Sequence, residues 1–282
     1  MSHYKANPAP GFVQRYAEAV LVPTKNPGQQ STLMPSLDLP PPYRAVMLRE
    51  RGDAVAHAQS IATRDGAGTL VWVRRFDTVE FAVVLEPEEP LVRARCALYA
   101  AMNAAADALA IHCPPERPLA FAWPDTILLD GGILGGARLS WPENALETAP
   151  PDWLVIGLVL RMTVPHARPA NRSAHALDQA VSRGTSLEIE GFEMMDGAAL
   201  IGGFARHFML QIDRWQEKGF RGIGEEFLAR LAEEKAIRRG IDVNGDLLTR
   251  RSSAGGTVQR QLLSAALAKP QWLDPETGDP WL

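Results

Sequence analysis

The chain has 282 residues, of which 46% are hydrophobic, enough for a sizeable buried core and too many for a disordered protein. A formal net charge of −4 gives no general attraction for nucleic acid, and two cysteines are too few for a disulfide framework. The sequence shows neither a long uncharged apolar run nor a secretion signal, so we expect a soluble cytoplasmic protein.

The lysines lie only in the first 25 and the last 65 residues of the sequence. They are Lys5, Lys25, Lys218, Lys235 and Lys269, so the middle of the chain has none. Codon bias toward arginine in a GC-rich genome is the simplest explanation. Whatever its origin, the distribution excludes any mechanism that requires a lysine in the middle of the chain.

The first 42 residues are rich in Pro, Gln, Asn and Ser, and they end in three consecutive prolines. Such a composition is typical of an extended or mobile leader, within which residues 12–22 could pack as a short helix. We therefore expect the folded body to begin near Tyr43.

The first half of the body predicts short helices and strands joined by tight turns. Asp53 is a suitable N-cap for a helix, and β-branched and aromatic residues favour strands. The predicted elements, in chain order, are a helix over 53–62, a turn over 65–68, strands over 69–75 and 78–85, and a long helix over 91–111.

The second half begins with short strands and ends with amphipathic helices. Because residues 152–162 are apolar almost throughout, we expect them to form the central strand of a sheet. The basic run 235–239 is interpreted as a solvated helix end. The other predicted elements are strands over 119–123, 126–129 and 136–141, a loop over 164–186, helices over 196–218 and 224–234, and a hairpin over 241–248.

The order of these elements indicates an α+β fold with a mixed sheet flanked by helices, because hairpins link most of the strands. The predicted organisation is a leader over 1–42, a body over 43–195 and a small C-terminal module over 196–282. The apolar stripe of the helix at 196–218 should dock on the body. The polar tail over 270–282 should be anchored by Trp272, Leu273, Trp281 and Leu282.

The segment FAWPDTILLDGGILGGARLSW, residues 121–141, resembles the core of the biotin/lipoate A/B protein ligase family. In biotin protein ligases a K-W-P-N-D motif is followed by a hairpin that carries a lysine and a G-G-I-L-like stretch. The matching residues are Trp123, Pro124 and Asp125 for the first motif, and Gly135 and Gly136 for the glycine pair.

Two more segments extend the resemblance over residues 43–165. Residues 66–72, GAGTLVW, stand where biotin ligases place their G-R-G-R-x-G-R nucleotide loop, and residues 152–162 resemble the strand that carries I-G-I-G-I-N. The helix end at Gly219 and the hairpin around Asn244 are similar to the C-terminal appendage of the family.

This resemblance implies a class II synthetase- or biotin ligase-like fold and a chemistry of acyl activation. In the family, a carboxylate reacts with ATP to give an acyl-adenylate, and the acyl group passes to a lysine of a biotinyl or lipoyl carrier domain. The implied ligand-binding residues are Trp123, Pro124, Asp125, Gly135 and Gly136. The implied nucleotide-binding residues are Gly66, Gly68, Arg74 and Arg75, with Mg²⁺ accompanying ATP.

The sequence departs from the family at the positions that carry the chemistry. Ala122 replaces the lysine of K-W-P-N-D, and the catalytic lysine position falls at or beside Ile133. Ala67 and Thr69 stand where the nucleotide loop has arginines. Arg138 could supply a catalytic positive charge from the neighbouring strand, although an arginine cannot act as a deprotonated amine.

Three functions remain compatible with these matches and departures. The protein could be a biotin- or lipoate-type ligase with Arg138 in place of the lysine, or an acyltransferase that uses a ready-made acyl donor. It could also be a non-catalytic accessory protein that binds a biotin-, lipoate- or octanoate-like ligand or a carrier protein. The missing lysine favours the last two, so we expect impaired ATP-dependent activation. We expect no nucleic-acid or membrane partner and no protein-bound metal, because His and Cys ligand motifs are absent.

Several residues of the resemblance also have a purely structural interpretation. Trp123 could be a core tryptophan at a strand end, and Asp130 could form the turn before two glycines. Gly135 or Gly136 could simply mark a β-bulge.

The cysteines and the helix over 196–218 offer further candidates. Cys113 beside His112 suggests a nucleophile, but adjacent side chains usually point apart, and Cys96 should pack in the core. His207 and Asp213 face different sides of their helix, so His207 is interpreted as structural.

Overall fold

The computed structural model describes residues 37–163, 184–192, 195–234, 236–251, 257–274, 278 and 280–281. The description concerns the compact unit that begins at Leu37. The predicted helix at 12–22 and most of the predicted loop at 164–186 lie outside the described residues.

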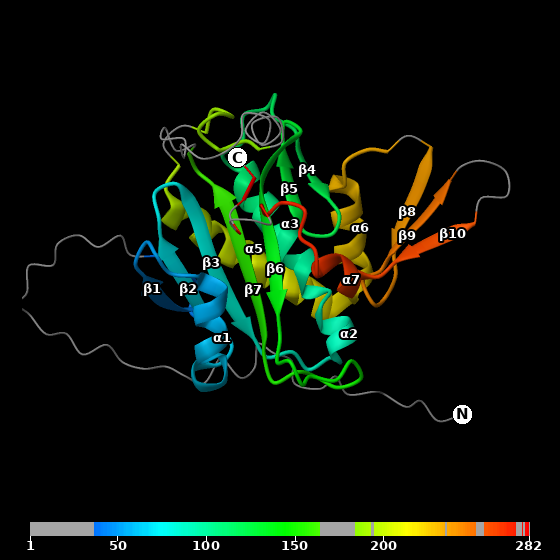
Figure 1. Ribbon diagram of the computed structural model, residues 1–282, viewed down its shortest axis with the longest axis horizontal. Helices are drawn as coiled ribbons and strands as arrows, with labels where there is room; N and C mark the ends of the chain where they lie inside the picture. Colours follow the sequence, from blue (N-terminus) through cyan, green and yellow to red (C-terminus); the bar gives the residue numbers. More distant parts are fainter. Residues whose placement is uncertain are drawn as a thin grey trace, which may run out of the picture. The chain divides into compact units, whose positions relative to one another are not determined.

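A seven-stranded mixed sheet forms the centre of this unit, in the order β1-β2-β3-β7-β6-β5-β4 (Figure 1). β1 and β2 pair in parallel, and the other neighbours pair antiparallel. β7 is the fourth of the seven strands, so the prediction of a central strand is confirmed. The strands are β1 Arg44–Leu48, β2 Thr69–Arg74, β3 Thr78–Leu85, β4 Leu119–Ala122, β5 Thr126–Leu129, β6 Gly132–Ser140 and β7 Leu154–Arg161.

Helix α1 (Ala54–Asp65) covers one face of the sheet, where it packs on β2, β3 and β7. It forms as predicted, since the Asp53 side chain accepts a hydrogen bond from the Ala56 amide at 2.9 Å. The helix approaches β7 so closely that a Cβ on Gly157 would lie 2.1 Å from Cγ2 of Val55. Glycine at this strand position therefore allows α1 to lie flat on the sheet.

The opposite face carries α3 and α5 (Figure 1). The single helix predicted over 91–111 is wrong in one respect, because α2 (Leu91–Ala94) and α3 (Ala97–Ala110) are separate. Between them the backbone makes hydrogen bonds between residues three apart, as in a 3₁₀-helix. For example, the Cys96 amide donates to the Arg93 carbonyl at 2.9 Å. The break accompanies the burial of Arg95, which pairs with Glu147.

Helix α5 (Gly197–Lys218) begins and ends as predicted, between its N-cap Asp196 and Gly219. Its apolar stripe docks on the sheet, with the Phe204 ring 4.8 Å from the ring of Phe81 on β3. α6 occupies Phe220–Arg230 rather than the predicted 224–234. The reason is Gly219, whose φ of 78° ends α5 and turns the chain directly into α6.

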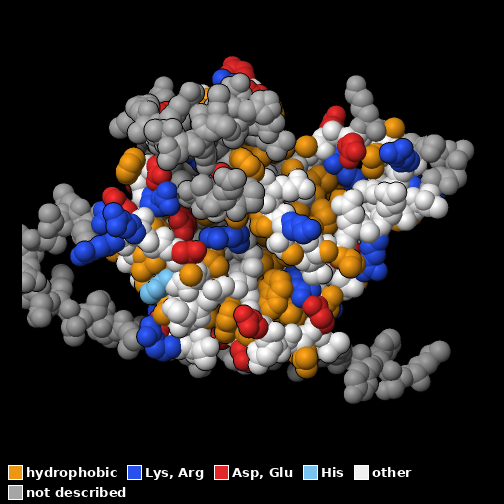
Figure 2. All heavy atoms as spheres, in the orientation of Figure 1, with side chains coloured by type: hydrophobic (Ala, Val, Ile, Leu, Met, Phe, Trp, Pro, Cys, Tyr) orange, Lys and Arg blue, Asp and Glu red, His pale blue; other side chains and the backbone are white. Residues whose placement is uncertain are grey.

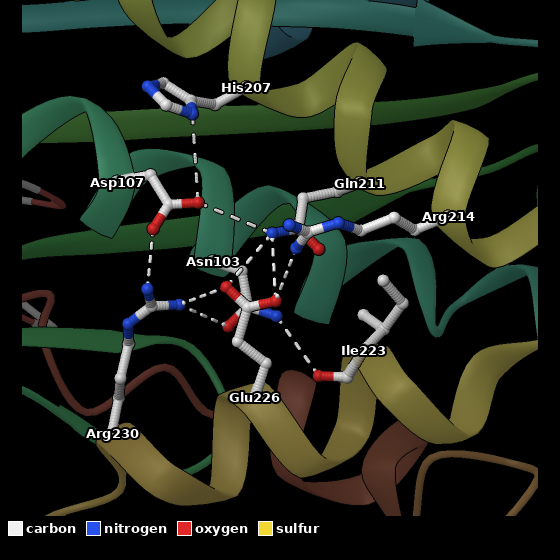
Figure 3. A network of polar contacts seen from close by, with 8 residues as sticks. All are labelled: Asn103, Asp107, His207, Gln211, Arg214, Ile223, Glu226 and Arg230. Atoms are coloured by element: carbon white, nitrogen blue, oxygen red, sulfur yellow. Dashed lines mark hydrogen bonds and ion pairs between the residues drawn. The ribbon is translucent and has the colours of Figure 1, made fainter. Parts of the chain in front are cut away.

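A polar network fixes α6 to α3 and α5 (Figure 3). The Arg230 guanidinium donates to Asp107 at 2.6 Å, to Glu226 at 2.9 Å and to Asn103 at 3.2 Å. The fully buried Asn103 amide also donates to the Ile223 carbonyl at 3.1 Å. His207 of α5 approaches Asp107 at 3.9 Å, as expected for a structural histidine.

A second sheet of three antiparallel strands and a short helix complete the C-terminal part. They are β8 Ile237–Ile241, β9 Leu247–Arg251, β10 Val258–Gln261 and α7 Leu263–Leu267. The predicted hairpin is confirmed, with Gly245 at a φ of 85° in its turn. The prediction that the basic run 235–239 ends a helix is wrong, since residues 237–239 begin β8.

Arg239 attaches the second sheet to the end of α6. Arg239 donates to the carbonyls of Leu231 and Ala232, which ties β8 to the end of α6.

Within the described residues, no helix is both long enough and apolar enough to cross a membrane.

Candidate functional site

The turn between β5 and β6 positions the glycine pair of the hairpin. Asp130 and Gly131 have φ values of 48° and 82°, which makes a two-residue turn and lets β6 begin at Gly132 instead of the predicted 136. In the register, Ile127 pairs with Gly135 but Leu128 pairs with Ile133. Leu134, which lies between these two partners on β6, is therefore the extra residue of a β-bulge. A β-bulge was the structural interpretation considered for Gly135 and Gly136.

Both glycines lie where other backbone atoms approach closely. A Cβ on Gly135 would lie 2.0 Å from the Val159 carbonyl oxygen, and one on Gly136 would lie 2.4 Å from the Asp125 carbonyl oxygen. Neither position has room for a side chain without movement of the backbone around it. The local geometry therefore explains these glycines before any ligand is considered.

Asp125 is an almost fully buried acid at the start of β5, with 1% of its surface exposed. Its Oδ1 accepts a hydrogen bond from the Thr126 hydroxyl at 3.1 Å. The Trp272 indole also interacts with the carboxyl, although Oδ2 has no hydrogen bond of normal geometry among the described residues. Burial raises its pKa to about 7, an effect only partly offset by the Thr126 hydroxyl and the Trp272 indole. A carboxyl in this state changes its charge near neutral pH.

Arg138 projects from β6 on the same face as Gly136, because alternate residues of a strand share a face. This is the face that α1 covers, since Arg138 pairs in register with Gly157. Its Nη2 lies 3.6 Å from Asp53 Oδ1, and its buried Nε makes no hydrogen bond within the part of the chain that is described. The positive charge proposed for catalysis thus already faces a carboxylate.

A second carboxylate, Glu80 of β3, lies at the N-terminus of α1. Its Oε1 accepts a hydrogen bond from the Ala54 amide at 2.8 Å, and only 7% of the residue is exposed. Burial raises the pKa of Glu80, while the bond from Ala54 and the charges of Arg138 and Arg75 act in the opposite direction. Glu80 and Asp53 therefore occupy the amides that would otherwise attract an anion to this helix end.

Of the two arginines assigned to the nucleotide site, Arg75 lies near this cluster. Its guanidinium donates twice to Asp77, at 3.0 and 2.9 Å, and lies 3.9 Å from Glu80 Oε2. Arg74 is half-buried. Because side chains alternate along a strand, it lies on the opposite face of β2 from Val73, which packs in the core under α1.

The glycines assigned to the nucleotide site lie elsewhere. Gly66 and Gly68, with φ values of 71° and 80°, form the turn between α1 and β2. Arg74 and Arg75 lie at the other end of this six-residue strand, about 20 Å away at the usual rise per residue. The structure does not bring the two pairs together.

Trp123 and Pro124, joined by a cis peptide bond, form the turn between β4 and β5. The Trp123 indole N–H donates at 2.9 Å to the hydroxyl of Tyr99, which in turn donates to the Gly245 carbonyl. Tyr99 belongs to α3, on the opposite face of the sheet from α1. Trp123 thus links the body to the C-terminal hairpin, and it is partly buried rather than the core tryptophan of its alternative interpretation.

The C-terminal tail reaches the face of the sheet that carries Gly136 and Arg138. Trp272 is fully buried, and a Cβ on Gly136 would lie 2.6 Å from its Nε1. In Figure 1 the tail runs from α7 across the sheet in front of β6. The sequence marked Trp272 as an anchor, but only the structure shows that it anchors on the proposed ligand face.

The remaining candidates offer little reactive chemistry. The Cys113 thiol donates to the Arg117 carbonyl at 3.2 Å, and burial raises its pKa, which is opposite to what a nucleophile requires. Cys96 is fully buried, as predicted. No cluster of His, Cys, Asp or Glu suited to a metal occurs among the described side chains.

The surface near the site carries charges of both signs. Figure 2 shows acidic and basic side chains interspersed over the face drawn in Figure 1. An open groove lies on the solvent side of α1, lined by Leu48, Arg49, Arg51, Asp53 and His57, with Gly52, Ala56 and Ser60.

The sheet is mixed, has helices on both faces, and carries Gly136, Arg138 and the N-terminus of α1 on one of them. The family model described as "Biotin/lipoate A/B protein ligase family" matches residues 39–229. The chain belongs to the biotin/lipoate A/B protein ligase family, as the motif around Trp123 indicated. A biotin–[acetyl-CoA-carboxylase] ligase of Paracoccus denitrificans is 27% identical over 206 residues, 69% of this chain and 81% of that protein.

Solved structures share the fold. A biotin protein ligase-like protein of unknown function from a Silicibacter species has a TM-score of 0.69 at 23% identity, covering 83% of this chain and 100% of that one. The biotin protein ligase of Aquifex aeolicus has a TM-score of 0.56 at 14% identity, covering 78% of this chain and 100% of that one. The predicted α+β class with a mixed sheet and helices is therefore confirmed.

Proposed function

We propose that the protein binds a small acyl ligand of the biotin, lipoate or octanoate type, and that it activates this ligand with ATP weakly or not at all. The ligand would lie on the sheet face that carries Asp125, Gly136 and Arg138. A biotinyl or lipoyl carrier domain is the partner that this family membership suggests. The role would then be that of an acyltransferase or of a non-catalytic accessory protein.

One observation supports the proposal: carboxylates pair with the arginines and the helix amides on this face that could otherwise receive a phosphate. Asp53 and Glu80 accept from the first amides of α1, Asp53 faces Arg138, and Asp77 pairs with Arg75. An incoming phosphate would have to displace these carboxylates and would meet their negative charge. The described residues at this position therefore do not fit the phosphates of ATP or an accompanying Mg²⁺ ion.

The absence of a lysine from the middle of the chain also argues against ATP-dependent activation. No lysine lies between Lys25 and Lys218, and Arg138 keeps its charge but is held toward Asp53. Losing one group aimed at developing negative charge typically slows such chemistry by about 10²- to 10³-fold. Biotin, lipoate and octanoate each carry one carboxylate, but binding of the uncharged ring or alkyl part against the sheet depends less on this charge, since such sites are mainly apolar.

Calorimetric titration tests the proposal. Biotin, lipoate, octanoate and ATP are titrated separately into the full chain. The variant Arg221→Ala, which removes an exposed arginine of α6, is titrated in the same way as a control. We expect one of the acyl ligands to bind and ATP to give no measurable heat. Tight ATP binding, or no binding by any acyl ligand, would contradict the proposal.

A further inference from the structure

We propose that the second sheet is a docking surface for an acidic segment of another protein, with Arg238 of β8 and Arg250 of β9 as the charges that receive it. This surface, the arginine face, consists of Arg238, Arg250 and Val258, with Leu248 and Arg260 beside them. It lies outside the site of the proposed function and does not depend on which acyl ligand that site takes.

The register of the three strands places the arginine face on one side of the second sheet. Arg238 pairs with Arg250, and Arg250 pairs with Val258 of β10, so these three residues form one row across the strands. Leu248 lies two residues from Arg250 and therefore on the same side. The other side carries Arg239, which donates to the carbonyls at the end of α6. The arginine face is thus the side that this attachment leaves open.

The row of three residues is open to solvent. Arg238 and Arg250 are exposed, and Val258 keeps 60% of its surface exposed. In Figure 1 the second sheet lies beyond α6, on the far side of that helix from the seven-stranded sheet. An apolar side chain flanked by exposed arginines offers a partner both a contact surface and a charge.

The charge of the second sheet is not balanced within the sheet. Residues 237–261 include five arginines and two aspartates, a net charge of +3, whereas the whole chain carries −4. One arginine takes both aspartates, because Arg260 lies 2.9 Å from Asp242 and 2.7 Å from Asp246. Among the residues that the structure describes, no carboxylate pairs with Arg238 or Arg250.

The two arginines of the row stand directly opposite each other. The Cβ atoms of such cross-strand partners lie about 4.5–5.5 Å apart, and like charges in this arrangement destabilise the sheet. Arg238 and Arg250 therefore do not serve the stability of the sheet they stand on. A carboxylate placed between them would relieve the repulsion and could accept charge-assisted hydrogen bonds from both guanidinium groups. Departures of this kind from local rules are expected at functional surfaces.

The chemistry of the surface favours an acidic protein segment over other occupants. The stretch 237–261 contains no aromatic residue on which a nucleic-acid base could stack, and the net charge of the chain repels a phosphate backbone. Residues 1–36 carry three basic residues and one acidic residue, so the chain's own leader would be repelled. A second copy cannot present the same face, because both faces would be basic.

Fluorescence anisotropy of a short labelled peptide of alternating glutamate and threonine tests the proposal on the full chain. The double variant Arg238→Gln/Arg250→Gln neutralises the row. Its matched control, Arg206→Gln/Arg221→Gln, removes the same charge from exposed positions of α5 and α6. We expect wild type to bind the peptide, more weakly as salt rises. The face variant should bind at least about 10-fold more weakly, and the control within about 2-fold of wild type.

Several results of this titration would overturn the inference. They are no binding by wild type, an equal loss of affinity in the two double variants, and tighter binding of a single-stranded DNA of the same charge than of the peptide. Salt-sensitive dimers of the protein alone, seen by sedimentation and lost in the face variant, would show that the occupant is a second copy and would also overturn it. None of these results bears on the proposed acyl-ligand site.

Thermal unfolding separates a docking role from a structural one. Because the face variant removes a like-charge pair, we expect its melting temperature to equal that of wild type or to rise by up to about 3 °C. A clear fall in melting temperature, with the control variant unchanged, would show that Arg238 and Arg250 hold the second sheet together and would overturn the inference.

Discussion

The buried carboxyl of Asp125 should make stability depend on pH in an unusual direction. Burial raises its pKa from 3.8 to about 7, against the smaller opposing effects of Thr126 and Trp272. Between about pH 4 and 7 the unfolded chain loses this proton while the folded protein keeps it. The free energy of unfolding therefore falls as the pH rises through this range, by at most about 4 kcal/mol.

Asp125→Asn removes the titration and keeps a side chain of the same shape. We expect the variant to be more stable than wild type at about pH 8, by about 1–3 kcal/mol, and to lose this advantage at about pH 4. Thr126→Val is the matched comparison, because it removes a hydrogen bond that lowers the pKa of Asp125. That variant should show a larger fall in stability over a wider pH range.

Urea unfolding at several pH values measures these differences, with the denaturant slope confirming that each variant unfolds like wild type. Parallel pH profiles for wild type and Asp125→Asn would refute the reasoning. That result would mean that the carboxyl is ionised in the folded protein, as it is in the unfolded chain.

Two further predictions concern packing and the polar network. Gly157→Ala should cost about 1–3 kcal/mol in thermal or urea unfolding, because its Cβ meets Val55 at 2.1 Å, whereas Gly222→Ala, with open space around it in α6, should be neutral or slightly stabilising. Equal effects of the two would contradict the close approach of α1 to β7. Arg230→Ala should cost about 1–3 kcal/mol, because it leaves buried partners of the network without their donor, whereas Arg221→Ala should cost at most about 0.5 kcal/mol. A neutral Arg230→Ala in the same assay would mean that the network does not hold α6.

The elements of the sheet that the sequence predicted well are those whose patterns are local. β7 is apolar except for Arg161 at its end, and the hairpin strands are bounded by glycine turns, so their existence could be inferred from neighbours in the chain. β1 was not predicted. It is an edge strand with mostly exposed residues, and its parallel partner β2 lies beyond α1. Nothing in the five residues themselves signals that pairing.

Some contacts of the candidate site also could not be predicted from the sequence. The motif around Trp123 identified the family, and Asp125, Gly136 and Arg138 do lie around one face. Glu80, however, matters because the fold brings it to the amide of Ala54, and no spacing in the sequence reveals that contact.

The tail and the tryptophan of the motif depend on contacts even more distant in sequence. Trp272 reaches Gly136, and Trp123 reaches Tyr99 and through it the hairpin. An aromatic residue in a polar tail signals burial, but it does not say against what. Roles that rest on such contacts required the structure.

The central claim is that this member of the family has a ligand face without a working nucleotide-activating site. ATP–pyrophosphate exchange in the presence of biotin or lipoate tests it most directly, measured with wild type and with Arg138→Ala. The account predicts absent or very weak exchange in both forms. Robust exchange that Arg138→Ala abolishes would contradict it, because Arg138 would then replace the lysine despite its contact with Asp53.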